Sequence, residues 1–170
     1  MNSADLLSDA FERISEAVHA SVEELSTDDL NARLDAGANS IAWLVWHLSR
    51  IQDDHLADAA EAEQVWLAQG WAERFELPFP KDATGYGHSS KQVAAVRVES
   101  AELLLGYFDA VHEQTRRFVR GLDDAALDRV VDDSWSPPVT LGVRLLSVIS
   151  DDLQHAGQAA FARGALERRS

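Results

Sequence analysis

The sequence predicts an all-α protein, a four-helix bundle with a long aromatic-rich loop between the second and third helices. Three observations carry this prediction. Apolar residues recur at spacings of three and four over four long segments, glycine- and proline-containing stretches separate these segments, and no segment has the pattern of a convincing strand. Four amphipathic helices can bury their apolar stripes against one another, which favours a bundle.

The first two predicted helices flank a short turn. The first helix spans residues 4–25 with Ser3 as its cap, and residues 26–28 restart the chain. Gly37 marks the next boundary. The second helix spans residues 41–60, and its inward-facing residues are Ile41, Leu44, Val45, Leu48, Ile51 and Leu56.

The second half of the chain contains two loops and two helices. Residues 69–90 combine glycines and prolines with four aromatic residues and are predicted to be a long loop, a feature that is usually functional. The third helix spans 91–120, and a second loop covers 132–138. Thr140 caps the fourth helix, which ends near Arg163 with Gly164 as a C-terminal stop.

Composition limits the possible functions. The 170 residues predict one domain over 1–170, and the 46% hydrophobic and 26% charged fractions are typical of a globular protein. The formal net charge of -14 argues against nucleic-acid partners, because phosphate would be repelled over most of the surface. Cysteine is absent, so no side chain of this sequence can supply a thiol nucleophile or thiolate ligand.

The sequence also predicts a cytoplasmic protein without a membrane partner. Its N-terminus mixes charged and apolar residues and lacks the apolar core of a signal peptide. The longest stretch without Asp, Glu, Lys or Arg covers residues 36–49, which is too short to span a bilayer.

Three side chains on the second and fourth predicted helices form a candidate metal site. His47 lies in the apolar run 41–48, so its ring faces the bundle interior or its mouth and needs a partner there. Asp151 precedes His155 by four residues, which places both side chains on one helix face. Two imidazoles and one carboxylate leave coordination positions for water or substrate, a pattern typical of catalytic metal sites.

Other interpretations of these residues stay open. His47 could be a core histidine bonded to a carbonyl, and the Asp151–His155 pair could be a hydrogen bond on a solvated face. Asp54 and Asp152 compete with Asp151 as the third ligand. Asp54 returns to nearly the same helix face as His47 after seven residues, whereas the direction of Asp152 is rotated by about 60° from that of His155.

Several short motifs lie at residues 43–48, 69–75, 84–88, 104–112 and 151–158, with Arg163 and Gly164. In their order and spacing they resemble the DinB-like superfamily of metal-binding helical bundles. The similarity is closer to the actinobacterial branch that includes mycothiol-dependent enzymes and mycothiol S-transferases, and it covers nearly the whole chain.

The resemblance implies a divalent metal held by one histidine of the second helix and a His-x-x-x-His pair of the fourth. His47 and His155 match this pattern, whereas Asp151 stands at the remaining position. The aspartate makes the site harder and one charge more negative. Zinc is the first expectation for the metal, and nickel or another divalent ion is the second.

The resemblance also implies a low-molecular-weight thiol, mycothiol, that is transferred to a small electrophile. A divalent cation deprotonates a bound thiol, which suits a chain without cysteine. We expect the loop aromatics Trp71, Phe75 and Tyr86 to wall the substrate pocket. Arg74 would make a polar contact there, and Trp46 and Gln158 would flank the metal ligands. Alternatively, the loop aromatics form a cluster that only fixes the loop to the bundle.

Two other functions compete with a metal-dependent S-transferase of the detoxification or stress type. One is a metal-dependent hydrolase or isomerase that uses bound hydroxide. The other is a non-enzymatic, stress-linked bundle that acts through self-association, since the fourth helix is apolar on more than one side and favours a homodimer. His88 is interpreted either as an acid or base or as an exposed loop residue.

Overall fold

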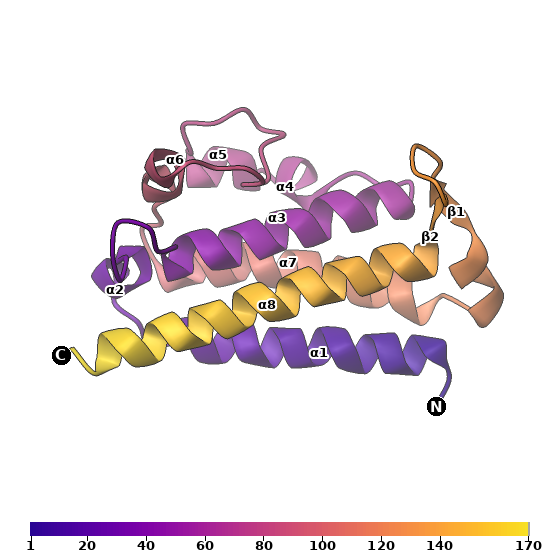
Figure 1. The fold of residues 1–170 in the computed structure, drawn as a ribbon, viewed down its shortest axis with the longest axis horizontal. Coiled ribbons are helices and arrows are strands. Elements are labelled where there is room, and N and C mark those ends of the chain that lie inside the picture. Colours follow the sequence, from indigo (N-terminus) through magenta and orange to yellow (C-terminus); the bar gives the residue numbers. More distant parts are fainter. Residues whose placement is uncertain (170) are drawn as a thin grey trace.

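The computed structural model, which describes residues 1–169, contains a bundle of four long helices (Figure 1). In this bundle, α1 packs against α7 and α8, and α3 packs against the same two helices. The all-α, four-helix prediction is confirmed. The long helices are α1 (Ser3–Val22), α3 (Ile41–Ala59), α7 (Ala101–Arg120) and α8 (Leu141–Glu167).

The first helix differs from the prediction at both ends. Asn2 rather than Ser3 caps α1, because its side chain accepts the N–H of Asp5 while the Asp5 carboxylate accepts the N–H of Asn2. Glu24 adopts a φ of 65°, so the chain leaves the helical path after Val22 instead of after residue 25. The predicted turn at 26–28 begins a short helix, α2 (Thr27–Asn31), whereas α3 agrees with the prediction within one residue.

The connection between α3 and α7 is long because both helices run in the same direction in Figure 1. The chain must therefore return along the bundle between them. This return segment contains three short helices, α4 (Val65–Ala68), α5 (Trp71–Phe75) and α6 (Ser90–Ala95). The predicted loop at 69–90 is thus partly helical, and Trp71 and Phe75 are buried within it.

The predicted third helix over 91–120 is interrupted in the structure, where residues 91–95 belong to α6 and α7 begins at Ala101. Residues 96–100 separate α6 from α7, and the side chain of Asn31 holds this segment extended. Asn31 accepts the N–H of Val98 at 2.9 Å and donates to the carbonyl of Val98 at 2.8 Å. This long-range pair outweighs the local helical pattern, and Ser100 then caps α7 by accepting the N–H of Leu103.

The segment before α8 contains a short hairpin that the sequence did not predict. After a 3-10 turn, η1 (Asp124–Asp128), β1 (Val130–Asp132) pairs antiparallel with β2 (Val139–Thr140). Thr140 caps α8 as predicted, but the helix continues through Gly164 to Glu167. Arg163 holds this end by donating to two carbonyls at the end of α1.

None of the helices within residues 1–169 combines the length and the apolar character that crossing a bilayer requires.

Candidate metal centre

The structure brings His47, Asp151 and His155 together between α3 and α8. His47 sits in the middle of α3 and is 5% exposed, while Asp151 and His155 lie one turn apart on the facing side of α8. One potential ligand atom from each residue lies within 4.8 Å of the other two. Zinc binds nitrogen and oxygen at about 2.1 Å, so two ligands of one ion lie at most about 4.2 Å apart. Small side-chain rotations therefore suffice to close the group on one ion.

Backbone carbonyls orient both imidazole rings. His47 donates from Nδ1 to the carbonyl of Thr84 at 2.6 Å, and His155 donates from Nδ1 to the carbonyl of Asp151 at 2.9 Å. A carbonyl only accepts hydrogen bonds, so the hydrogen of each neutral ring lies on Nδ1. The Nε2 atoms are then free to bind a metal, which is the usual arrangement of metal-ligating histidines.

The carboxylate of Asp151 supports the same interpretation. Its Oδ2 atom is buried and accepts no hydrogen bond from the described residues, and it lies 3.6 Å from Nδ1 of His155. A buried carboxylate oxygen without a partner is costly. A cation between the two helices would satisfy it, so the donor set of two nitrogens and one oxygen fits a divalent metal.

The environment of His47 favours its neutral form. Burial lowers the pKa of His47, and repulsion from His155 and His88 lowers it further, while the bond to Thr84 and the charge of Asp151 oppose the shift. A histidine must be neutral to bind a metal. The lowered pKa of His47 therefore keeps this ligand available at neutral pH.

The competing carboxylates lie outside this group. Asp54 accepts a hydrogen bond from Gln64 Nε2 at 2.8 Å and approaches His55 rather than His47. Asp152 faces the core of the bundle and is completely buried. Within residues 1–169, the group that could hold an ion includes Asp151 and neither of the other two.

We expect Asp152→Asn to stabilise the metal-free protein relative to wild type, and this gain should grow as pH rises. Neither carboxylate oxygen of Asp152 has a hydrogen-bond partner among the described residues, and burial, with Asp151 nearby, raises its pKa well above the usual value. The unfolded chain releases this proton near pH 4 while the folded chain keeps it, so rising pH costs the wild type about 1.4 kcal/mol per unit. We expect Asp152→Asn to gain about 1–3 kcal/mol at pH 7.5 by urea unfolding.

The gain from Asp152→Asn should shrink at pH 5, because keeping Asp152 protonated in the folded chain costs less free energy closer to the pKa of the unfolded chain. The exposed Asp58 supplies the control, and Asp58→Asn should change stability little at either pH. A difference between Asp152→Asn and wild type that does not vary with pH would contradict this prediction.

Aromatic rings cover the ligand group on the side of residues 84–88. Trp43 stacks on His47 with centroids 4.6 Å apart and lies 6.1 Å from His155. The indole Nε1 of Trp43 donates to Nδ1 of His88 at 3.2 Å, and the His88 ring packs against Trp46 at 5.9 Å. His88 is therefore a half-buried neighbour of the site. One of its two interpretations from the sequence was an exposed loop residue.

Gly85 is a further residue of the site that sequence reasoning did not single out. Its φ is 93°, and a Cβ there would lie 2.8 Å from Nδ1 of His47 and 3.0 Å from the Trp46 ring. The absence of a side chain thus lets the loop approach the ligand closely. In the sequence alone, a loop glycine does not indicate that the loop lies against His47.

Three of the predicted substrate residues differ in how close they lie to the ligands. Trp46 is buried beside His88, and its ring packs below Gly85. Gln158 is exposed one turn beyond His155 and lines a cavity of about 580 Å³ between α8 and the α2–α3 connection. Tyr86 is 89% exposed and forms no wall in this structure.

The other two predicted substrate residues lie on α5 against a different part of the bundle. Trp71 packs on Tyr107 of α7 at 5.9 Å and fills the space beside Gly106. The guanidinium of Arg74 lies 4.4 Å from the centroid of the Trp71 ring and lines a cavity beside Asn31 of α2. This placement favours the alternative that the loop aromatics fix the loop to the bundle.

Comparisons with known proteins agree with the all-α fold. The sequence model of the DinB superfamily matches residues 10–159. Four solved chains match, among them the crystal structure of a conserved protein from Enterococcus faecalis, with a TM-score of 0.89 and 30% identity over 96% of each chain. No curated protein matches this sequence.

Proposed function

We propose that this chain, which belongs to the DinB superfamily, is a metal-dependent S-transferase that joins a low-molecular-weight thiol, mycothiol, to small electrophiles. The observation that carries the proposal is the convergence of His47, Asp151 and His155 with both histidine Nε2 atoms free. Three such ligands leave coordination positions for a substrate. The proposal places the protein in the cytoplasm, in detoxification or stress, acting on small molecules.

Each residue of the site would have one role. His47 and His155 would hold the metal through Nε2 and Asp151 through a carboxylate oxygen. When bound, a divalent cation supplies the positive charge that lowers the pKa of a thiol. The transfer forms one sulfur–carbon bond and breaks the S–H bond of the thiol and the bond from the electrophilic carbon to its leaving group. With monochlorobimane the leaving group departs as chloride, and the thiol proton passes to solvent. Trp43, stacked on His47, shields one side of the site from water.

Zinc is the metal that we propose first, with nickel or another divalent ion second. Zinc accepts imidazole nitrogen and carboxylate oxygen in catalytic sites with three protein ligands. The donor set alone does not select among the divalent ions of intermediate hardness, because imidazole suits several of them.

The proposal predicts thiol-dependent turnover of monochlorobimane. Protein loaded with zinc should conjugate this electrophile to mycothiol at least about tenfold faster than the uncatalysed reaction, a barrier lowered by about 1.4 kcal/mol. The fluorescence of the conjugate measures the rate. Treatment with a chelator should abolish the increase, and added zinc should restore it.

The other outcomes of this assay identify the competing functions. Turnover of an electrophile without added thiol would contradict the transferase and indicate a metal-dependent hydrolase or isomerase. Protein that binds no metal and has no activity would indicate the non-enzymatic bundle. The homodimer stays a prediction, and the exposed apolar residues Leu146, Leu153 and Phe161 of α8 are its candidate surface.

A further inference from the structure

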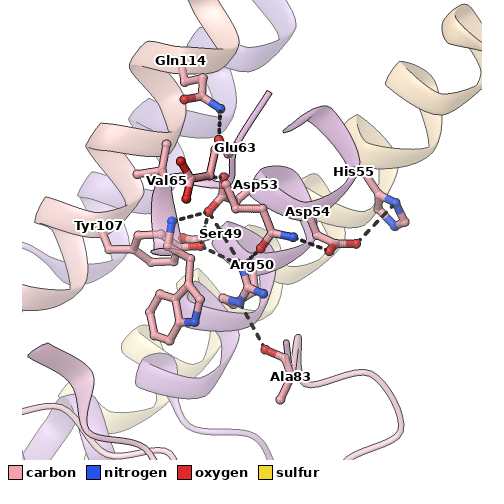
Figure 2. Close-up of polar contacts among 12 residues, drawn as sticks. Ser49, Arg50, Asp53, Asp54, His55, Glu63, Val65, Ala83, Tyr107 and Gln114 are labelled. Carbon is pink, nitrogen blue, oxygen red and sulfur yellow. Dashed lines mark hydrogen bonds and ion pairs between the residues drawn. The ribbon is translucent and has the colours of Figure 1, made fainter. Parts of the chain in front are cut away.

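A completely buried arginine lies one turn from His47 on α3. Figure 2 shows Arg50 between Val65, the first residue of α4, and Ala83 of the return segment. Its Nε donates to the carbonyl of Ala83 at 3.1 Å, and its Nη1 donates to Gln64 Oε1 at 2.9 Å and to the hydroxyl of Tyr107 at 3.4 Å. Nη1 also lies 3.7 Å from Asp53 Oδ2.

The ion pair with Asp53 does not explain why the guanidinium of Arg50 donates its hydrogen bonds to other residues. Asp53 already accepts the N–H groups of Val65 and Trp66, at 2.9 and 2.8 Å, and the hydroxyl of Tyr107 at 2.9 Å. The charge of Asp53 offsets that of Arg50 in the core, where an unpaired cation would be costly. The directed hydrogen bonds of the guanidinium instead go to Gln64 and the carbonyl of Ala83 in the return segment and to the hydroxyl of Tyr107 on α7.

Ala83 precedes the residue that orients the metal ligand. The carbonyl of Thr84 accepts the Nδ1–H of His47, so two successive carbonyls are held by two side chains of α3. His47 and Arg50 are three residues apart and lie on the same side of the helix. Gly85 follows and lies in contact with the His47 ring, which is possible because glycine has no Cβ.

We propose that Arg50 is the positioning residue of His47. By holding the carbonyl of Ala83, Arg50 fixes the neighbouring carbonyl of Thr84. That carbonyl fixes the ring orientation of His47 and keeps its hydrogen on Nδ1, so that Nε2 faces Asp151 and His155. The link to metal binding rests on the proposed function, whereas the effect on the His47 ring does not.

The decisive variant is Arg50→Lys, which keeps a positive charge near Asp53 but removes the Nε donor to Ala83. In the metal-free protein, the ring nitrogens of His47 should show one tautomer, Nδ1–H, in wild-type ¹⁵N spectra and a mixture of both in the variant. The affinity for Co²⁺, followed by its visible absorption, should fall about 10- to 100-fold, as when other orienting partners of ligands are lost. A folded variant with the wild-type tautomer and affinity overturns the proposal.

Tyr107→Phe is the matched control. It removes a hydroxyl from the same buried network, with its bond to Asp53, but leaves the bond from Arg50 to Ala83. We expect the wild-type tautomer of His47 and a Co²⁺ affinity within about threefold of wild type. An equal loss in Tyr107→Phe would show that Arg50 acts only through core stability, and would overturn the proposal.

Wild-type protein supplies a test that does not depend on the folding of any variant. The Nε–H of Arg50 should exchange with solvent at least about 100-fold more slowly than that of the exposed Arg13, and it should show a scalar coupling to the Ala83 carbonyl carbon. Exchange as fast as in Arg13 overturns the proposal. If wild type binds no Co²⁺ but the tautomer responds to Arg50→Lys, the proposed function fails while the positioning role of Arg50 stands.

Discussion

Alanine at His47 is expected to abolish stoichiometric metal binding, with a loss of affinity of at least about 100-fold. Removing a partner that only orients a ligand already costs about 10- to 100-fold, and His47 is one of three ligands. Asp151→Ala should have the same result, because it removes the carboxylate that opposes the positive charge of the ion. Metal content of the purified proteins by mass spectrometry, with zinc titration of the metal-free forms, measures both losses.

His55→Ala is the matched control for this prediction. His55 is another histidine of α3, half-buried where His47 is buried. It accepts a hydrogen bond from Arg144 at 2.9 Å and lies outside the group of His47, Asp151 and His155. This variant should keep its metal. Unchanged metal content in both His47→Ala and Asp151→Ala would remove the proposed site, and with it the transferase.

Alanine at Asp53 is expected to lower the free energy of unfolding by about 3–5 kcal/mol, the range measured when one partner of a buried ion pair is removed. The substitution leaves Arg50 without a compensating charge. It also leaves the N–H groups of Val65 and Trp66 and the hydroxyl of Tyr107 without their acceptor. Urea unfolding of the metal-free protein at pH 7.5 measures the loss, so that metal binding does not enter the result.

The neighbouring Asp54 supplies the control for the core prediction. Asp54 is partly exposed and accepts one hydrogen bond from Gln64, so Asp54→Ala should cost less than about 1 kcal/mol. Similar losses in the two variants would mean that the network around Arg50 contributes no more than a surface contact.

The long helices and their buried faces were predictable from local patterns. The stripe of α1, the bounds of α3 and the cap at Thr140 follow from spacings within a few residues. Local patterns were wrong where distant residues competed for the same backbone. Asn31 pulls Val98 out of the predicted third helix, and Arg163 extends α8 past Gly164 by binding the end of α1.

The aromatic residues of the return segment show the same division. Their number in residues 69–90 indicated a packed loop, but the sequence assigned Trp71 and Tyr86 alike to the substrate pocket. The structure packs Trp71 on α7 and leaves Tyr86 exposed, while Trp43 and His88 cover the ligand group. An aromatic residue type alone does not indicate whether its ring packs on the bundle, covers the site or faces solvent. The path of the chain decides this.

The sequence by itself determined that His47 lies on an apolar helix and that Asp151 and His155 share one face of another, because a helix places residues four apart on the same side. Only the tertiary structure decided that these faces meet, that Asp151 joins them rather than Asp54 or Asp152, and that Thr84 orients His47. The physical reason is that convergence depends on the packing of α3 against α8 and on a return segment held by Arg50, contacts between residues far apart in the chain.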